Sequence, residues 1–279
     1  MTLGRSKIRM VVSDLDGTFL DNDSLISEAN RLAVKALQDQ GIRFVLATGR
    51  THLMIREYRR QLCNEEPSIA CNGALIFNEH TDEVLYSRSI LEDDVSCLYH
   101  YLASNNVDFL AYSFHAVYYP FNSVRIKFFH DYNQMALSGG STPVTLFPLE
   151  KMFIDNRLVE PIYKLFIQTD DDQIISDVKR IINQTQGLSS VQSMSANLDV
   201  MPADVSKGTA VQRLTEYYGL SIDEVAVFGD HDNDVSMMEV AGLSFGMENG
   251  SELAKSSCTH VAPPNYEDGF AQMVEKYIL

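Results

Sequence analysis

Short apolar runs alternate with stretches of helical periodicity over the first 75 residues. Three of the runs are short and apolar enough to be strands buried on both faces: 8–12, 42–47 and 68–71. A helix is predicted between the first two, with Ser27 as its N-cap and Gly41 as its C-terminal stop. A second helix is predicted around 53–62. This order of elements predicts a parallel sheet wrapped by helices.

The same alternation returns after residue 203. Three helices and three strands are predicted there, the helices at 206–218, 234–241 and 267–278 and the strands at 225–228, 243–245 and 260–262. The two ends of the chain therefore predict two halves of one α/β core, a Rossmann-like, doubly wound parallel sheet.

The middle of the chain has a different pattern. Residues 75–86 predict a hairpin that turns at 78–82. Two helix-strand-strand units follow, one with its helix near 95–102 and strands at 107–112 and 116–121, the other with its helix near 174–182 and strands at 190–194 and 198–201. Only one strand, 163–168, is predicted between them, and 123–160 carries no assignment. The repeated unit predicts an inserted domain of α+β design.

The charge balance limits the classes of partner. The 279 residues include 22 lysines and arginines against 38 aspartates and glutamates, so the formal net charge is −16. Such a chain repels phosphate backbones and anionic lipid, which argues against nucleic acid or a membrane as the main partner. An anionic small molecule would need cations that are concentrated locally.

The expected compartment is the cytoplasm. No apolar run approaches the roughly 20 residues that span a bilayer. The amino terminus carries Arg5, Lys7 and Arg9, but its apolar stretch ends at Asp14, so no signal peptide is predicted. The four cysteines form no CxxC pair and no regular spacing, as expected of reduced thiols.

Four polar strings follow predicted strands or open predicted helices. They are Asp14-Leu15-Asp16-Gly17-Thr18, Thr48-Gly49-Arg50, Ser206-Lys207-Gly208 and Gly229-Asp230-His231-Asp232-Asn233-Asp234. Open α/β sheets bind ligands outside the carboxyl ends of their strands, so these strings occupy the chemically useful edge. Thr48 and the backbone N–H groups at a helix start suit a phosphate, and Lys207 at a helix N-terminus is unfavourably placed unless an anion compensates it.

Each string alone also has a purely structural interpretation as a solvated turn, a helix cap or a surface lysine. Two further motifs do not fit the chain. A calcium loop that starts at Asp230 would need glycine and glutamate where Val235 and Ala241 stand. A GxSxG elbow at Ser244 would need a position between a strand and a helix, whereas Ser244 lies within a predicted strand.

Taken in order, the strings DLDGT, TGR, SKG and GDHDND resemble the four motifs of the haloacid dehalogenase superfamily. The hairpin entry Asn72-Gly73-Ala74, the stretch 198–208 and the tail Asp268-Gly269 are similar to those of its Cof-type phosphatases. The resemblance implies a hydrolase core at 1–83 and 202–279, with an α+β cap domain at 84–201 that sets substrate specificity.

The resemblance also implies roles for individual residues. Asp14 would be the nucleophile that becomes a transient aspartyl phosphate, and Asp16 the general acid and then the base. Mg²⁺ would be held by Asp14, the backbone carbonyl of Asp16 and Asp230, with Asp234 bound directly or through water. Phosphate would be bound by Leu15, Thr48, Gly49, Lys207 and Asn233, the last fixing either Lys207 or a phosphate oxygen.

The expected function is Mg²⁺-dependent hydrolysis of small phosphomonoesters, such as sugar phosphates or phosphorylated cofactors, by a monomer or weak homo-oligomer. Two alternatives stay open, a phosphomutase or phosphotransferase of the same superfamily and a non-enzymatic phosphate or metal sensor. Aromatic residues at 112–121 are interpreted as part of a sheet, while Arg125 and Lys127 are candidates to face an anionic or polyol substrate.

Overall fold

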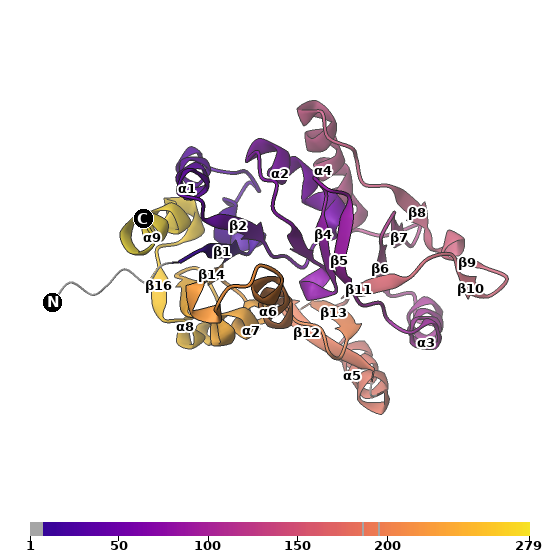
Figure 1. Cartoon of the computed structure of the whole chain (residues 1–279). Helices are drawn as coiled ribbons and strands as arrows, with labels where there is room; N and C mark the ends of the chain where they lie inside the picture. The colour runs from indigo at the N-terminus through magenta and orange to yellow at the C-terminus, as the bar shows by residue number, and fades with distance from the viewer. Residues whose placement is uncertain (1–7, 186, 195) are drawn as a thin grey trace.

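A computed structural model describes residues 8–185, 187–194 and 196–279. The chain forms two lobes, as Figure 1 shows. The amino-terminal and carboxyl-terminal segments, in indigo and yellow, lie together in one lobe, and the middle of the chain forms the other. The architecture is therefore the predicted one, an α/β core with an inserted α+β cap. The core and cap boundaries at residues 83 and 202 remain a prediction.

The core is built on a parallel sheet of five strands in the order β16-β15-β14-β1-β2. These are β1 (Met10–Ser13), β2 (Arg43–Leu46), β14 (Val225–Gly229), β15 (Leu243–Met247) and β16 (His260–Ala262). A parallel bridge between Ala47 and Ile69 adds β3 (Ser68–Ala70) at the edge. The strand order reverses beside β1, and such a reversal is where ligands bind in open sheets.

Helices cover both faces of this sheet, which explains why its strands are apolar throughout. Val11 faces α1 (Glu28–Asp39) and α9 (Gly269–Tyr277), while Met10 and Val12 face α6 (Lys207–Tyr217) and α7 (Val235–Val240). α8 (Glu252–Ser257) packs on β15. The predicted cap and stop are confirmed, because the Ser27 hydroxyl accepts the Asn30 N–H at 3.1 Å and Gly41 has a φ of +72°.

The predicted hairpin is formed by β4 (Leu75–Asn78) and β5 (Glu83–Ser87), and β4 also pairs with β3. The cap has a six-stranded sheet in the order β12-β13-β11-β6-β7-β8. Its strands are β6 (Asp108–Ser113), β7 (Val117–Tyr119), β8 (Leu146–Pro148), β11 (Ile162–Gln168), β12 (Leu188–Met194) and β13 (Asn197–Pro202). The helices α3 (Glu92–Ser104) and α5 (Asp172–Gln184) pack on one face, so the repeated unit is confirmed as two units that flank β11.

The unassigned stretch holds the element that sequence patterning missed. It contains α4 (Ile126–Gly139) and the two-stranded ribbon of β9 (Phe153–Ile154) and β10 (Arg157–Leu158). α4 begins without a side-chain cap, and Ile126 and Phe128 at its start alternate like a strand. The strand predicted at 116–121 ends at Tyr119, because Pro120 has no N–H to continue the strand pairing, and Phe121 beyond it is 96% exposed.

α2 (Arg56–Gln61) follows a short 3₁₀ turn at His52–Met54 and contacts α4 of the cap.

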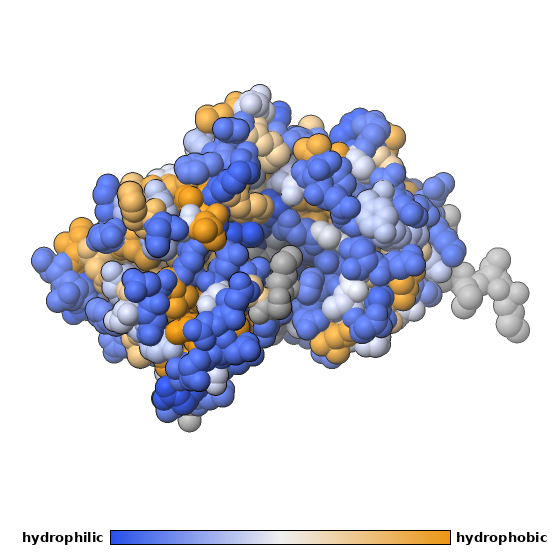
Figure 2. Space-filling view, turned by 180° about the vertical axis from the view of Figure 1, so that it is seen from behind, coloured by the Kyte–Doolittle hydropathy of each residue, from blue (hydrophilic) through white to orange (hydrophobic). Residues whose placement is uncertain are grey.

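The four cysteines are free, as predicted. In the part of the chain that the structure describes, no helix is long and apolar enough to cross a membrane. Seen from behind, the surface is mostly hydrophilic, with apolar residues scattered over it (Figure 2).

His52 gives the protein a pH-dependent stability. Its ring is 3% exposed and lies 5.2 Å from the Phe77 ring and 4.7 Å from the Phe114 ring of the cap. Burial lowers the pKa of His52 from 6.5 to about 3. Because the unfolded chain binds this proton near pH 6.5 and the folded chain does not, folding stability is lost as the pH falls from about 6.5 towards 3.

We expect the wild type to lose about 2–3 kcal/mol more than a His52→Leu variant between pH 7 and pH 4.5. Urea unfolding of both proteins across this range measures the difference. The exposed His130 on α4 provides the control, since His130→Gln should follow the wild-type curve. Parallel curves for wild type and His52→Leu would show that His52 is not buried in its neutral form.

Candidate active site

A cavity of about 430 Å³ lies where the carboxyl ends of the core strands face the cap. Core residues from three of the four strings line it: Asp14, Asp16, Gly17, Thr48, Gly49, Arg50, Asp230, His231 and Asn233. Asp14 follows β1 directly, and its N–H donates to Phe228 O of β14 at 2.9 Å. Neighbouring parallel strands thus carry residues that are more than 200 positions apart to one edge, as the sequence predicts.

Lys207, from the remaining string Ser206-Lys207-Gly208, lies beneath this cavity. Its side chain is fully buried, and its Nζ lies 2.6 Å from Asp14 Oδ1 and 2.6 Å from Asp234 Oδ1. A capping box of Ser206 and Thr209 fixes the helix start that presents it. Burial lowers the pKa of Lys207, but the two carboxylates outweigh it and raise that pKa above its usual value. The sequence predicts an anion near Lys207, and the structure supplies it as the carboxylates of Asp14 and Asp234.

The carboxylates of Asp14, Asp230 and Asp234 form one buried cluster, with an oxygen of each within 4.8 Å of the others. Burial raises the pKa of Asp14 well above its usual value; Lys207 opposes this, and Asp234 and Asp230 add to it. Burial and Asp234 likewise raise the pKa of Asp230 to about 7. The cluster therefore carries more negative charge than Lys207 neutralises, and a further cation would stabilise its ionised form.

The donor set fits Mg²⁺, which prefers hard oxygen ligands and keeps several waters. Asp230 Oδ1 accepts the Thr18 hydroxyl at 2.9 Å, which leaves Oδ2 for an ion. A Cβ at Gly17 would stand 2.4 Å from that Oδ2, so the backbone approaches closely there. Asp234 is less suited, because Oδ1 is bound to Lys207 and Oδ2 accepts the N–H groups of Asp230 and His231, each at 3.0 Å.

Asp16 is held by Arg50, whose role the sequence did not reveal. The guanidinium donates from Nε to Oδ2 at 2.8 Å and from Nη2 to Oδ1 at 2.5 Å. Burial acts to raise the pKa of Asp16, but the charge and hydrogen bonds of Arg50 lower it below its usual value. Asp16 is therefore ionised in this arrangement, with 52% of its side chain exposed to the cavity side.

The predicted phosphate-binding residues differ in whether their side chains can reach a phosphate in this cavity. The Thr48 hydroxyl accepts the Arg50 N–H at 3.1 Å and donates to no described residue, so its proton can face a ligand. Asn233 Nδ2 donates to Asn72 Oδ1 at 3.0 Å, and Lys207 donates to the stronger carboxylate acceptors Asp14 and Asp234 rather than to Asn233. The side chain of Leu15 is buried in the core, so only its backbone can face a phosphate.

The cap contributes residues that sequence reasoning missed. Lys164 of β11 is 4% exposed; its Nζ donates to Gly49 O at 2.6 Å and lies 2.9 Å from Asp199 Oδ1. Asp199 Oδ2 in turn accepts from Asn72 Nδ2 at 2.8 Å. A buried ion pair therefore joins the cap to two core loops. A charged lysine within an apolar strand pattern was the available signal.

Neither alternative motif gains support from the structure. Ser244 is 1% exposed inside β15, and its hydroxyl accepts the Thr259 N–H at 3.1 Å, so it is no nucleophile elbow. Asp232 is exposed and accepts the Ser251 hydroxyl at 2.7 Å.

Comparison with known proteins agrees with this geometry. The family described as haloacid dehalogenase-like hydrolase matches residues 11–274. Two relatives from Bacillus subtilis (strain 168) are named 5-amino-6-(5-phospho-D-ribitylamino)uracil phosphatase. YcsE is 25% identical over 98% of this chain and 96% of its own length, and YwtE is 28% identical over 97% and 98%. A crystal structure of a haloacid dehalogenase-like hydrolase from Bacteroides thetaiotaomicron superposes with a TM-score of 0.82 at 26% identity, covering 97% of this chain and 99% of the other.

Proposed function

The chain belongs to the haloacid dehalogenase-like hydrolase family, and on that premise we propose that it is a Mg²⁺-dependent phosphatase that works through a phosphorylated Asp14. The observation that carries the proposal is the buried cluster of Asp14, Asp230 and Asp234 around Lys207 at the strand ends. When bound, Mg²⁺ would supply charge that screens the repulsion between an attacking carboxylate and a phosphate dianion.

Asp14 is the nucleophile in this proposal. Its Oδ1 is held by Lys207, which leaves Oδ2 to attack phosphorus while the bond to the leaving oxygen breaks. The Thr48 hydroxyl, the backbone N–H groups of Leu15 and Gly49, and Asn233 would bind the equatorial phosphate oxygens. Water then attacks the phosphorus of the aspartyl phosphate, which releases inorganic phosphate and restores the carboxylate. Asp230 would hold the ion, and Asp234 would act through Lys207 and the loop amides.

Asp16 gives a proton to the leaving oxygen and later takes one from water. Its pair with Arg50 favours the ionised form and thus suits the second role. For the first role Asp16 must carry a proton, so the pair with Arg50 must open when substrate binds. A phosphate oxygen that accepts the Arg50 donors would open it.

The cap favours a leaving group with a flat, polar ring. Phe128 and Phe166 line the cavity, and the Arg125 guanidinium carbon lies 4.3 Å and 5.1 Å from their ring centroids. No ion pair to Arg125 occurs within the described residues, so its donors can face a ligand. Lys127 instead pairs with Asp131 at 2.8 Å on the exposed side of α4. With the names of the relatives, this supports 5-amino-6-(5-phospho-D-ribitylamino)uracil as a candidate substrate.

The test is phosphate release from sugar, polyol, nucleotide and cofactor monoesters, each with Mg²⁺ and with EDTA. We expect release only with Mg²⁺ and the highest kcat/KM for a phosphorylated polyol that bears a planar ring. Arg125→Gln should raise KM for that substrate about tenfold and leave glycerol phosphate unchanged, whereas Lys127→Gln should change neither. Equal phosphate release in EDTA would contradict the proposed Mg²⁺ dependence. No release from any monoester would contradict the proposed phosphatase activity.

A further inference from the structure

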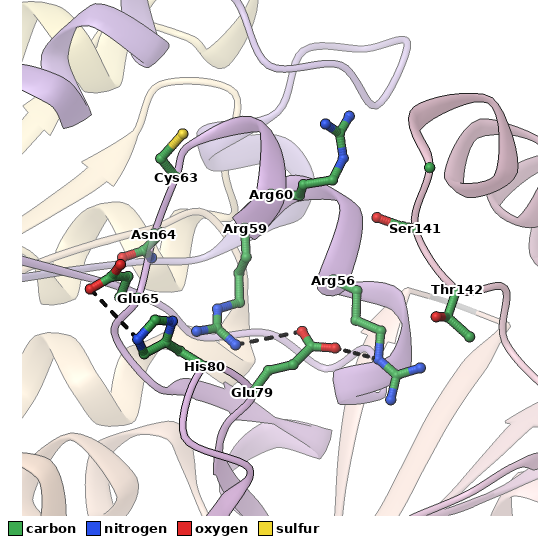
Figure 3. Close-up of a pocket in the computed structure, with 11 residues that line it drawn as sticks. Arg56, Arg59, Arg60, Cys63, Asn64, Glu65, Glu79, His80, Ser141 and Thr142 are labelled. Carbon is green, nitrogen blue, oxygen red and sulfur yellow. Dashed lines mark ion pairs between the residues drawn. The ribbon is translucent and has the colours of Figure 1, made fainter.

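A second cavity, of about 450 Å³, lies between α2 of the core and the end of α4 in the cap. None of its lining residues belongs to the active-site cavity. Figure 3 shows Arg56, Arg59 and Arg60 of α2 on one side, with Ser141 and Thr142 of the cap across from them. Its volume is in the range of small-molecule sites. Three arginines gathered at one cavity stand out in a chain with a net charge of −16.

Arg59 is the decisive residue, because it is buried and lacks hydrogen bonds. Its side chain is 6% exposed, and its nearest carboxylate contact is Nη1 to Glu79 Oε2 at 3.6 Å, too long for a hydrogen bond. No described residue accepts a hydrogen bond from this guanidinium, and its Nε is among the buried atoms without a partner. A buried charged donor in this state is costly unless an acceptor outside the protein satisfies it.

The carboxylates around the cavity do not neutralise the arginines. Glu79 is shared, since its Oε1 also pairs with Arg56 Nε at 2.7 Å. Glu57 Oε1 pairs with Arg60 Nη2 at 2.7 Å, and Glu57 is not part of the lining. Glu65 is 74% exposed at the rim and faces His80 at 3.9 Å. Arg59 therefore shares its nearest carboxylate with Arg56 and is left without a hydrogen-bonded acceptor.

We propose that this cavity binds a phosphate-sized oxyanion between the core and the cap. Arg59 and Arg56 supply fork-shaped donors from successive turns of α2, a geometry suited to tetrahedral oxyanions. Thr142 adds an exposed side chain from the cap, while the Ser141 hydroxyl already donates to Glu57 Oε2 at 2.6 Å. A bound oxyanion would link α2 to the segment after α4, and so would tie the cap to the core at a point away from the reaction.

The test is calorimetric titration of the full-length protein with inorganic phosphate and, separately, with glycerol 2-phosphate, both in EDTA. The titration needs no turnover, and an active-site variant separates the two cavities, so its outcome is distinguishable from that of the proposed function. We expect saturable binding of phosphate, and reduced hydrogen exchange at 140–145 when it is bound. Binding of phosphate alone would identify a free-anion site, and binding of both a site for phosphorylated metabolites.

Arg59→Gln and Arg56→Gln should each weaken phosphate binding at least tenfold. The control Arg31→Gln, on an exposed i,i+3 pair of α1, should bind like the wild type. Thr48→Ala should also bind like the wild type, which separates this cavity from the active site. If Arg59→Gln does not fold, Arg56→Gln carries the test, since its side chain is 24% exposed. No binding to the wild type, or unchanged binding to both arginine variants, would overturn the proposal.

Discussion

An Asp14→Asn variant will keep its fold and lose turnover of a generic aryl phosphate by about 10⁴-fold or more. The amide lacks the nucleophilic oxygen that attacks phosphorus, and no other carboxylate can replace it. Asp230 Oδ1 is held by Thr18, and both oxygens of Asp234 are already engaged. The fold survives because an amide oxygen can still accept from Lys207 and because a carboxyl with a raised pKa is removed from a crowded cluster.

The measurement is phosphate release with Mg²⁺, combined with trapping of the phosphorylated protein. Mass spectrometry of the variant excludes deamidation of the introduced amide back to aspartate. Asp232→Asn is the matched control, because Asp232 lies in the same acidic loop with an exposed side chain. It should keep wild-type turnover. Retention of a tenth of the activity by Asp14→Asn would remove Asp14 from the proposed mechanism.

The core could be predicted from the sequence because its strands are buried on both faces and its polar strings stand directly after them. Val11 and Val12 face opposite helix layers, so the whole run is apolar, and the first polar residues after it, Ser13 and Asp14, lie at the sheet edge. α4 could not be predicted. Its buried residues Phe129, Tyr132 and Ala136 pack at the junction of cap and core and stand at helical spacing, but Ile126 and Phe128 at its start alternate like a strand and obscure that period.

The same contrast holds for the site. Lys207 could be predicted because a lysine at a helix start needs a nearby anion, a local electrostatic argument. The pair of Arg50 with Asp16 and that of Lys164 with Asp199 join residues 34 and 35 positions apart, from different elements. Lys164 stands out locally as a charged residue in an apolar strand, but nothing in the local sequence identifies Asp199 as its partner or Arg50 as the partner of Asp16. Neighbouring strands of the folded chain bring each pair together: Asp16 and Arg50 follow the paired core strands β1 and β2, and Lys164 and Asp199 lie on the paired cap strands β11 and β13.

Lys207 is expected to have the largest effect on stability. A Lys207→Met variant keeps the length of the side chain but leaves Asp14 and Asp234 buried without their common cation. We expect the free energy of unfolding to fall by about 3–5 kcal/mol at pH 7 in EDTA, the range seen when one partner of a buried ion pair is removed. Because the pKa of Lys207 is raised in the folded protein, its stabilisation is fully present at neutral pH and is lost only in strong base.

Urea unfolding in EDTA measures this loss, with Lys35→Met as the control. Lys35 pairs with Asp39 at 3.0 Å on the exposed face of α1, and its loss should cost no more than about 0.5–1 kcal/mol. The difference between Lys207→Met and wild type should shrink as the pH falls, since protonation of Asp14 removes the unpaired charge that destabilises the variant. Mg²⁺ should likewise stabilise Lys207→Met more than wild type, because an added cation takes over part of the neutralisation. A loss that is small at pH 7 and unchanged by acid or Mg²⁺ would mean that Lys207 does not balance this cluster, and the charge argument for the metal would fail with it.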